Sequence, residues 1–238
     1  MSTVKPTIEF GHGSHTGLRR DHNEDTYCAD SQLGLWLVAD GMGGHDHGEV
    51  ASALARDYVS QQFAEGKTLS ESIVIADRAI MRLSDDRKSE RPMGTTVVAL
   101  VVREHDFEVA WVGDSRAYTY DGTLKQLSRD HSYVQELVDT GMLTPDQAKT
   151  SPHRNVVTQA LGVTLPEQLR VESVRGQLKP GAMLMLCSDG LTEEVDDSEI
   201  AAILARGFSA QESVDHLILA ALDGGGSDNV TVLLLKCS

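Results

Sequence analysis

Four short apolar segments of this sequence each meet an aspartate at one end. Three of them run into Asp40-Gly41, Asp114-Ser115 and Asp189-Gly190, and in the fourth case Asp228-Asn229 comes first. The segments are rich in Val and Leu and are bounded by turn residues, which predicts buried strands. In chain order they are Leu35–Ala39, Phe107–Val112, Ala182–Cys187 and Val230–Leu235.

These strand ends predict where the four carboxylates lie. If the last strand runs antiparallel to the others, all four collect at one edge of a sheet. For any single position, ordinary turn chemistry is a sufficient explanation, because Asp-Gly favours tight turns. Four such positions together favour a carboxylate site. Unpaired carboxylates that are packed together repel strongly, so the cluster requires cations.

The helices indicate the fold class. Thr68-x-x-Glu71 and Ser209-x-x-Glu212 are capping boxes, and each precedes an apolar stripe at helical spacing. A third stripe, from Val50 to Tyr58, follows the first Asp-Gly turn. The strands and helices do not alternate regularly, so we expect an α+β domain of mostly antiparallel sheets with helices packed outside.

Composition excludes several classes of partner. The formal net charge of −15 argues against binding to nucleic acid or to an anionic membrane. No apolar run approaches the roughly 20 residues of a membrane span. Three cysteines at no metal-like spacing indicate reduced thiols, and Met1–Phe10 contains no cationic apolar leader. We therefore expect a cytoplasmic protein, and a monomer because coiled-coil and repeat signals are missing.

One segment interrupts this pattern. Residues 130–162 contain a short helical pattern near Tyr133, a second helix start at Thr144-Pro145, and Ser151-Pro152. This composition predicts a small helical insertion or flap. The rest of 1–238 contains no linker, so we expect a single domain that carries the flap.

Missing motifs exclude several classes of enzyme. The sequence has no P-loop, no dinucleotide fingerprint, no His-Glu-x-x-His zinc helix and no Gly-x-Ser-x-Gly elbow. The residues that follow Cys187 do not form the glycine-rich loop of a cysteine-dependent phosphatase. Asp121-Gly122-Thr123 lacks the upstream aspartate of an aspartyl-phosphate enzyme, and it reads as a hairpin turn. Covalent catalysis therefore has little support, and the mechanism that remains is attack by a metal-activated water.

Carboxylate oxygens favour Mg²⁺ or Mn²⁺. Two such ions about 4 Å apart activate water and hold the oxygens of a displacement at phosphorus. The reaction also needs a cation for the phosphate and a general acid for the leaving oxygen. Arg20 and His45 are the candidates, although a surface ion pair and a polar helix start are the simpler interpretations of each alone.

The sequence resembles the metal-dependent protein serine/threonine phosphatases of the PPM (protein phosphatase 2C-like) family, in their compact bacterial form. The matching motifs occur in family order and span nearly the whole chain. They are 17-GLRRDHNEDT-26, 38-VADGMGGH-45, 48-GEVAS-52, 93-MGTT-96, 111-WVGDSRAY-118, 127-LSRDHS-132, 155-NVVTQALG-162, 186-LCSDGL-191 and 226-GSDNVT-231.

The resemblance implies a four-layer α-β-β-α sandwich, in which two mainly antiparallel sheets are flanked by helices. It also implies two or three Mn²⁺ or Mg²⁺ ions. Asp40 would bridge two of them, with the Gly41 carbonyl on one, and Asp189 and Asp228 would complete the pair. A third ion would bind Asp114 together with Asp189.

The resemblance assigns further roles around these ions. Arg20 would bind the substrate phosphate, and His45 would protonate the leaving serine or threonine oxygen. Glu24 would hold a metal-bound water, Asp25 would support the metal ligands, and Asn229 would steady the last loop. Asp46 is a departure from many relatives, and its charge would raise the pKa of His45.

Three functions compete at this point. The first is a phosphoprotein phosphatase that hydrolyses phosphoserine or phosphothreonine and opposes a bacterial Ser/Thr kinase. The second is a binding module that has lost catalysis, and the third is a phosphatase of nucleotides or other small phosphates. The complete set of acids, Arg20 and His45 favours the first.

Overall fold

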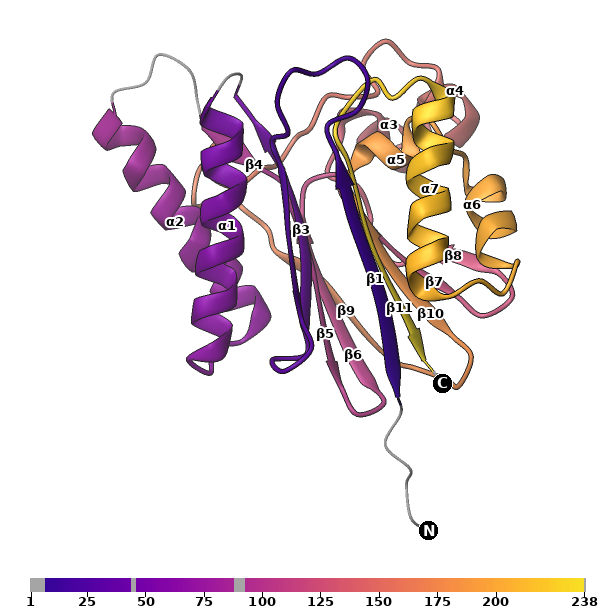
Figure 1. The fold of residues 1–238 in the computed structure, drawn as a ribbon. Coiled ribbons are helices and arrows are strands. Elements are labelled where there is room, and N and C mark those ends of the chain that lie inside the picture. The colour runs from indigo at the N-terminus through magenta and orange to yellow at the C-terminus, as the bar shows by residue number, and fades with distance from the viewer. Residues whose placement is uncertain (1–6, 44–45, 88–92, 238) are drawn as a thin grey trace.

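Two antiparallel sheets packed face to face form the centre of the protein (Figure 1). The structure is a computed structural model and describes residues 7–43, 46–87 and 93–237. The first sheet has the order β1-β11-β10-β7-β8, and the second has the order β2-β3-β5-β6-β9 with the short β4 beside β3. Every neighbouring pair of strands is antiparallel.

The strands of the first sheet are β1 (Ile8–His15), β7 (Arg116–Tyr120), β8 (Leu124–Gln126), β10 (Met183–Cys187) and β11 (Val230–Cys237). Those of the second are β2 (Asp25–Asp30), β3 (Leu35–Met42), β4 (Gly94–Thr95), β5 (Val97–Arg103), β6 (Asp106–Val112) and β9 (Glu172–Gln177). All four apolar segments at the aspartates are therefore strands. Asp121-Gly122-Thr123 is the β7–β8 hairpin turn, as predicted.

The helices begin where the capping boxes predict. Glu71 accepts from the Thr68 amide at the start of α2, and Ser209 caps α7 together with Glu212. The helices are α1 (Asp46–Ala64), α2 (Leu69–Arg87), α3 (Tyr133–Asp139), α4 (Pro145–Lys149), α5 (Asp189–Thr192), α6 (Asp197–Leu204) and α7 (Ala210–Gly224).

Three apolar layers hold four structural layers together. One lies between the helices α1 and α2 and the second sheet, and includes Ile73 and Leu37. The next lies between the sheets, around Trp36 and Leu233. The last lies between the first sheet and α5–α7, around Leu217. The predicted α-β-β-α sandwich is thus confirmed, with α1 and α2 outside one sheet and α5–α7 outside the other (Figure 1).

The topology brings the four aspartates to one end of the sandwich, but not to one edge of a single sheet. Asp40 lies near the end of β3 and Asp114 follows β6, both in the second sheet, while Asp189 and Asp228 adjoin β10 and β11 of the first. The expectation of one sheet edge was wrong in this respect. A spacing argument detects strand ends, but it does not show that the strands are divided between two facing sheets.

Residues 130–162 leave the sandwich at this same end and carry α3 and α4. Their base is closed, since the Tyr133 amide donates to the Val156 carbonyl and the Thr158 amide donates to the His131 carbonyl. No helix among the described residues is long and apolar enough to cross a bilayer. The cysteines Cys28, Cys187 and Cys237 are free thiols.

Candidate functional site

The backbone at Asp40 is fixed by its neighbours before any ligand binds. The Asp40 carbonyl accepts from the Thr96 amide at 2.8 Å and from the Thr95 hydroxyl at 2.8 Å. The next residue, Gly41, leaves no room for a side chain, because a Cβ there would lie 2.2 Å from the Gly48 carbonyl oxygen. The end of β3 therefore holds Asp40 against the start of α1.

Asp25 lies beside Asp40, because the two residues are paired across β2 and β3. Its Oδ2 accepts from the Ser188 hydroxyl at 2.8 Å and from the Thr231 hydroxyl at 2.7 Å. Its other oxygen, Oδ1, is buried without a hydrogen-bond partner. Burial raises the pKa of Asp25 to about 7, although both hydroxyls act to lower it.

Three further carboxyls share this low-dielectric environment. Burial raises the pKa of Asp40 well above its usual range, and the charges of Asp25, Asp189 and Asp114 add to the effect. Burial followed by the charge of Asp189 does the same to the pKa of Asp114. Burial and then the charge of Asp228 raise the pKa of Asp189. The site is therefore a group of mutually repelling acids that protons or cations must neutralise.

Asp228 already contacts a cation. The Arg20 guanidinium donates to its Oδ2 at 2.6 Å, and this hydrogen bond is the main reason that the pKa of Arg20 is raised. The Arg20 side chain is more than half exposed, with 56% of its surface accessible. Arg20 thus lies at the open side of the carboxylate group, next to solvent from which a phosphate would arrive.

Asn229 joins two connections at this end of the molecule. Its Oδ1 accepts from the Glu24 amide at 2.8 Å, and its Nδ2 donates to the carbonyls of Thr16 and His22 at 2.8 and 2.9 Å. The β1–β2 and α7–β11 connections consequently lie side by side (Figure 1). This arrangement holds Glu24, whose pKa is raised mainly by burial, close to Arg20.

His45 lies outside the described residues, and so does the side chain of Asp46. Among the other predicted residues, the structure brings together Arg20, Glu24, Asp25, Asp40, Gly41, Asp114, Asp189, Asp228 and Asn229.

The site fits hard divalent cations in its chemistry. Its donors are carboxylate oxygens, and Oδ1 of Asp189 is buried without a hydrogen-bond partner. Such an oxygen is costly unless a cation or proton meets it. Among the described residues, no three candidate side chains converge closely enough to surround a single ion. Mg²⁺ keeps several waters and takes only one or two carboxylates directly, so it does not require three protein ligands.

Sequence reasoning missed the residues that support this group. Ser188 and Thr231 occur in the recognised motifs, but only the structure shows that both bond to Asp25. A polar residue inside an otherwise apolar strand is the signal that indicates such a buried partner. His131 is also buried, and it accepts from the Gly113 amide at 3.1 Å.

A second missed contact joins β7 to the start of residues 130–162. Arg116 donates to both carboxylate oxygens of Asp130, at 2.7 to 3.0 Å. This pairing is bidentate, which adds geometric specificity to the charge interaction. It fixes the chain shortly after Asp114, and the Asp130 charge contributes to the raised pKa of Asp114.

Comparison with known proteins places this geometry in a family. Residues 13–223 match the family described as Protein phosphatase 2C. The serine/threonine phosphatase stp of Listeria welshimeri is 35% identical over 234 residues, which cover 92% of each chain.

Two solved structures share the fold. Serine/threonine phosphatase Stp1 from Staphylococcus aureus superposes with a TM-score of 0.89 at 32% identity, over 99% of this chain and 97% of that one. The catalytic domain of the phosphatase PstP in complex with two manganese ions gives 0.85 at 32% identity, over 97% and 99%. By sequence match and by fold, the chain belongs to the protein phosphatase 2C family, whose members hydrolyse phosphate esters.

Proposed function

We propose that this chain is a Mn²⁺- or Mg²⁺-dependent phosphatase of phosphoserine and phosphothreonine in proteins, and that residues 1–238 form one catalytic domain with 130–162 as its flap. The observation that carries the proposal is the group of Asp40, Asp114, Asp189 and Asp228 at one end of the sandwich, whose repulsion protons or cations must neutralise. Its relatives are serine/threonine phosphatases, and one was solved with two manganese ions.

Each of the two sheets would contribute part of the metal ligands. Asp40 and the Gly41 carbonyl, from the second sheet, would face Asp189 and Asp228, from the first. Asp114 would hold a third ion together with Asp189. When bound, the ions would supply Lewis-acid activation of water and neutralise charge at phosphorus. The orphaned Oδ1 of Asp189 supports this arrangement.

The remaining residues would bind and position the substrate. Arg20 is exposed and would exchange its contact with Asp228 for the phosphate oxygens, which its planar fork suits. His45 would give a proton to the leaving serine or threonine oxygen. Glu24 and Asp25 would orient waters and ligands, and Asn229 would keep the two connections together.

A substitution at the centre of the group tests this function. After metal removal and addition of Mn²⁺, Asp40→Asn should abolish hydrolysis of a phosphothreonine peptide and leave the far-ultraviolet circular dichroism unchanged. Asp121→Asn makes the same chemical change in the exposed β7–β8 turn and should keep full activity. Undiminished hydrolysis by the Asp40 variant would overturn the proposal.

The choice of substrate needs a separate comparison. A phosphatase of nucleotides or other small phosphates would use the same acids, because fold and site chemistry do not fix the leaving group. We expect kcat/KM to be higher for phosphopeptides than for nucleotides. The physiological role would be to oppose a bacterial Ser/Thr kinase. A phosphosite that accumulates after gene deletion, and that the pure enzyme then dephosphorylates, would identify the substrate.

A further inference from the structure

One aspartate that the proposed reaction does not use is buried in the middle of α2. Asp77 is 1% exposed, and it shares a helix face with Ile73 and Ile80, which lie one turn before and after it in the apolar layer against the second sheet. A carboxyl group in such a place is costly unless a donor meets it. Burial accordingly raises the pKa of Asp77. An apolar residue would pack here without that cost, so the position requires a reason other than packing.

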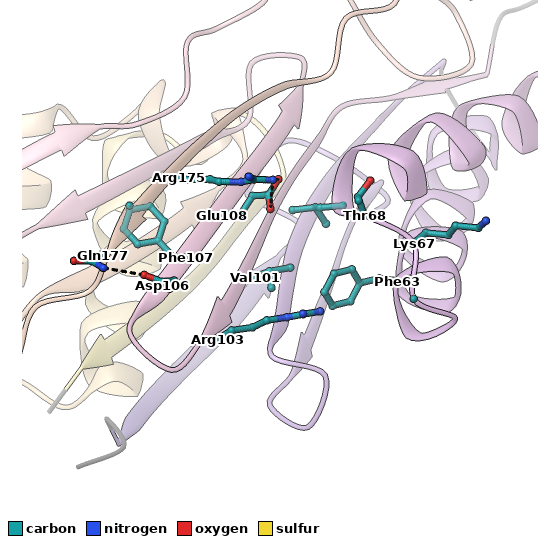
Figure 2. Close-up of a pocket in the computed structure, with 13 residues that line it drawn as sticks. Phe63, Lys67, Thr68, Val101, Arg103, Asp106, Phe107, Glu108, Arg175 and Gln177 are labelled. Carbon is teal, nitrogen blue, oxygen red and sulfur yellow. Dashed lines mark hydrogen bonds and ion pairs between the residues drawn. The ribbon is translucent and has the colours of Figure 1, made fainter. Parts of the chain in front are cut away.

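Two cavities beside α2 do not reach this carboxyl group. A groove of about 580 Å³ lies at the start of the helix and is lined by residues that include Phe63, Thr68 and Arg103 (Figure 2). Thr68 comes nine residues before Asp77, which corresponds to about 13 Å along a helix. A second cavity, of about 380 Å³, is lined by Arg82 and other residues of α1 and α2. Asp77 lines neither cavity, so a ligand bound in either one does not account for it.

The partner of Asp77 is the backbone of Gly162. The Gly162 amide donates to Oδ1 of Asp77 at 2.8 Å. This close approach depends on the missing side chain, because a Cβ on Gly162 would lie 2.3 Å from Cγ2 of Ile80 and 2.5 Å from the Met93 carbonyl oxygen. Gly162 is the last residue of the segment 130–162. The hydrogen bond therefore fixes the end of that segment against α2.

The residue before Gly162 is bonded to the backbone around Asp40. The Leu161 amide donates to the Thr95 carbonyl at 2.9 Å, and the Thr95 amide donates to the Leu161 carbonyl at 3.1 Å. The Thr95 hydroxyl in turn donates to the Asp40 carbonyl at 2.8 Å. Leu161 and Thr95 are both 0% exposed, so water does not replace a hydrogen bond that is lost here. A continuous series of short contacts thus joins Asp77 to Asp40.

We propose that Asp77 is a positioning residue for the metal site, which acts through this series of contacts to hold the Asp40 backbone in the conformation that binds a divalent cation. Without the Asp77 oxygen, the Gly162 amide would lose its acceptor, and the chain beside it would shift. Groups that orient metal ligands from outside the coordination sphere change metal affinity by about 10- to 100-fold when they are replaced. The inference rests on the proposed function, because Asp40 must bind the ion.

Mn²⁺ binding to the metal-free protein, followed by titration calorimetry, tests this role without catalysis. Asp77→Ala should weaken Mn²⁺ binding about tenfold. Asp77→Asn keeps a carbonyl oxygen for the Gly162 amide, so it should bind Mn²⁺ as the parent does. Ser72→Ala is the matched control on α2: it removes a buried hydroxyl whose bond, to the Thr68 carbonyl at 2.9 Å, is local to the start of the helix. This control should keep the parent affinity.

Amide hydrogen exchange in the metal-free proteins separates positioning from general stability. In Asp77→Ala, the amides of Leu161 and Thr95 should exchange faster than in the parent, by a larger factor than the amides of Leu233 and Leu235 in the central strand β11 of the first sheet. A purely structural role would accelerate all four amides by the same factor, because it would act through global unfolding.

A measurement on the parent does not depend on how the variants fold. Coupling between two sites is reciprocal, so a cation bound at Asp40 should stabilise the contact between Asp77 and Gly162. Saturating Mg²⁺ should therefore slow exchange of the Gly162 amide by a larger factor than exchange of the Ser72 amide, which bonds to the Thr68 carbonyl at the start of the same helix.

Four results would each overturn the proposal. They are parent affinity for Mn²⁺ in Asp77→Ala with native circular dichroism, an equal loss of affinity in Asp77→Ala and in either Asp77→Asn or Ser72→Ala, equal acceleration of all four amides, and an equal effect of Mg²⁺ on the amides of Gly162 and Ser72. If the parent binds neither Mn²⁺ nor Mg²⁺, the proposed function fails. In that case the exchange rates of the metal-free variants still decide whether Asp77 holds the backbone at Thr95.

Discussion

At the level of single residues, Asp25 is the clearest case of a side chain whose surroundings act in opposite directions on its charge. It is buried beside Asp40, accepts two hydroxyl hydrogen bonds on one oxygen and none on the other, and has a pKa raised to about 7. Near neutral pH, small changes around it therefore alter its charge. The hydroxyls favour the charged form, whereas burial and neighbouring acids favour the neutral form.

Thr231→Val removes one of these hydroxyls and keeps the shape of the side chain. At pH 8, where Asp25 is charged, we expect the free energy of unfolding of the metal-free protein to fall by about 1–3 kcal/mol, because a buried carboxylate loses a donor. At pH 6 the loss should be smaller, because the neutral acid depends less on that donor. Urea unfolding at the two pH values measures both. A loss that is equal at pH 6 and pH 8 would contradict this account of Asp25.

The acids also set the pH dependence of stability without metal. Because the folded-state pKa values of Asp25, Asp40, Asp114 and Asp189 are raised, the folded state binds more protons than the unfolded state between pH 5.5 and 7.5. The free energy of unfolding should therefore fall as pH rises, by up to about 1.4 kcal/mol per pH unit for each full proton of difference. His131 acts in the opposite direction, because burial lowers its pKa, but it is one group against four acids.

Urea unfolding in chelator at pH 5.5, 6.5 and 7.5 measures this slope. Asp40→Asn should reduce the slope, because that variant has one repelling carboxylate fewer. A stability that rises with pH across this range in the parent would contradict the raised pKa values.

At the level of elements, the site depends on how closely α5 approaches the connection before β11. A Cβ on Gly190 would lie 2.0 Å from the Asn229 carbonyl oxygen, so Asp189 and Asp228 are held together by a contact that only glycine allows. Gly190→Ala should separate them, lower the free energy of unfolding by about 1–3 kcal/mol and strongly reduce Mn²⁺-dependent hydrolysis.

Ser209→Ala is the matched control, because it removes the α7 cap away from the acids. It should cost about 1 kcal/mol and leave hydrolysis unchanged. Denaturant unfolding and phosphopeptide assays on both variants give the comparison. Normal activity in Gly190→Ala would show that this close approach does not position the ligands.

Local signals in the sequence were sufficient to predict where most helices and strands begin and end. Strand ends, capping boxes and the hairpin turn at Asp121 are set by neighbouring residues, and the structure confirms them. The division of the aspartates between two sheets, and the bonds from Ser188 and Thr231 to Asp25, depend on contacts across long stretches of chain. The groove at Phe63 and Arg103 likewise exists only once α1 packs beside β5.

For the whole molecule, the acid excess divides into two parts. Most of the −15 net charge lies on residues outside the site, while the buried acids form a compact group that opposes folding without a counter-charge. Two divalent ions would bring the net charge to about −11. A ligand that binds only the folded state adds about 2.7 kcal/mol at one hundred times its Kd, so Mn²⁺ should raise the melting temperature.

Equilibrium dialysis of the metal-free protein against Mn²⁺ tests the central claim, that these acids form a divalent metal site. The account predicts two or three ions bound per chain of the parent and of Asp121→Asn, with a raised melting temperature in both. It predicts that Asp40→Asn binds fewer ions and gains less in melting temperature. Equal Mn²⁺ binding by the parent and Asp40→Asn, or no binding by either, would contradict it.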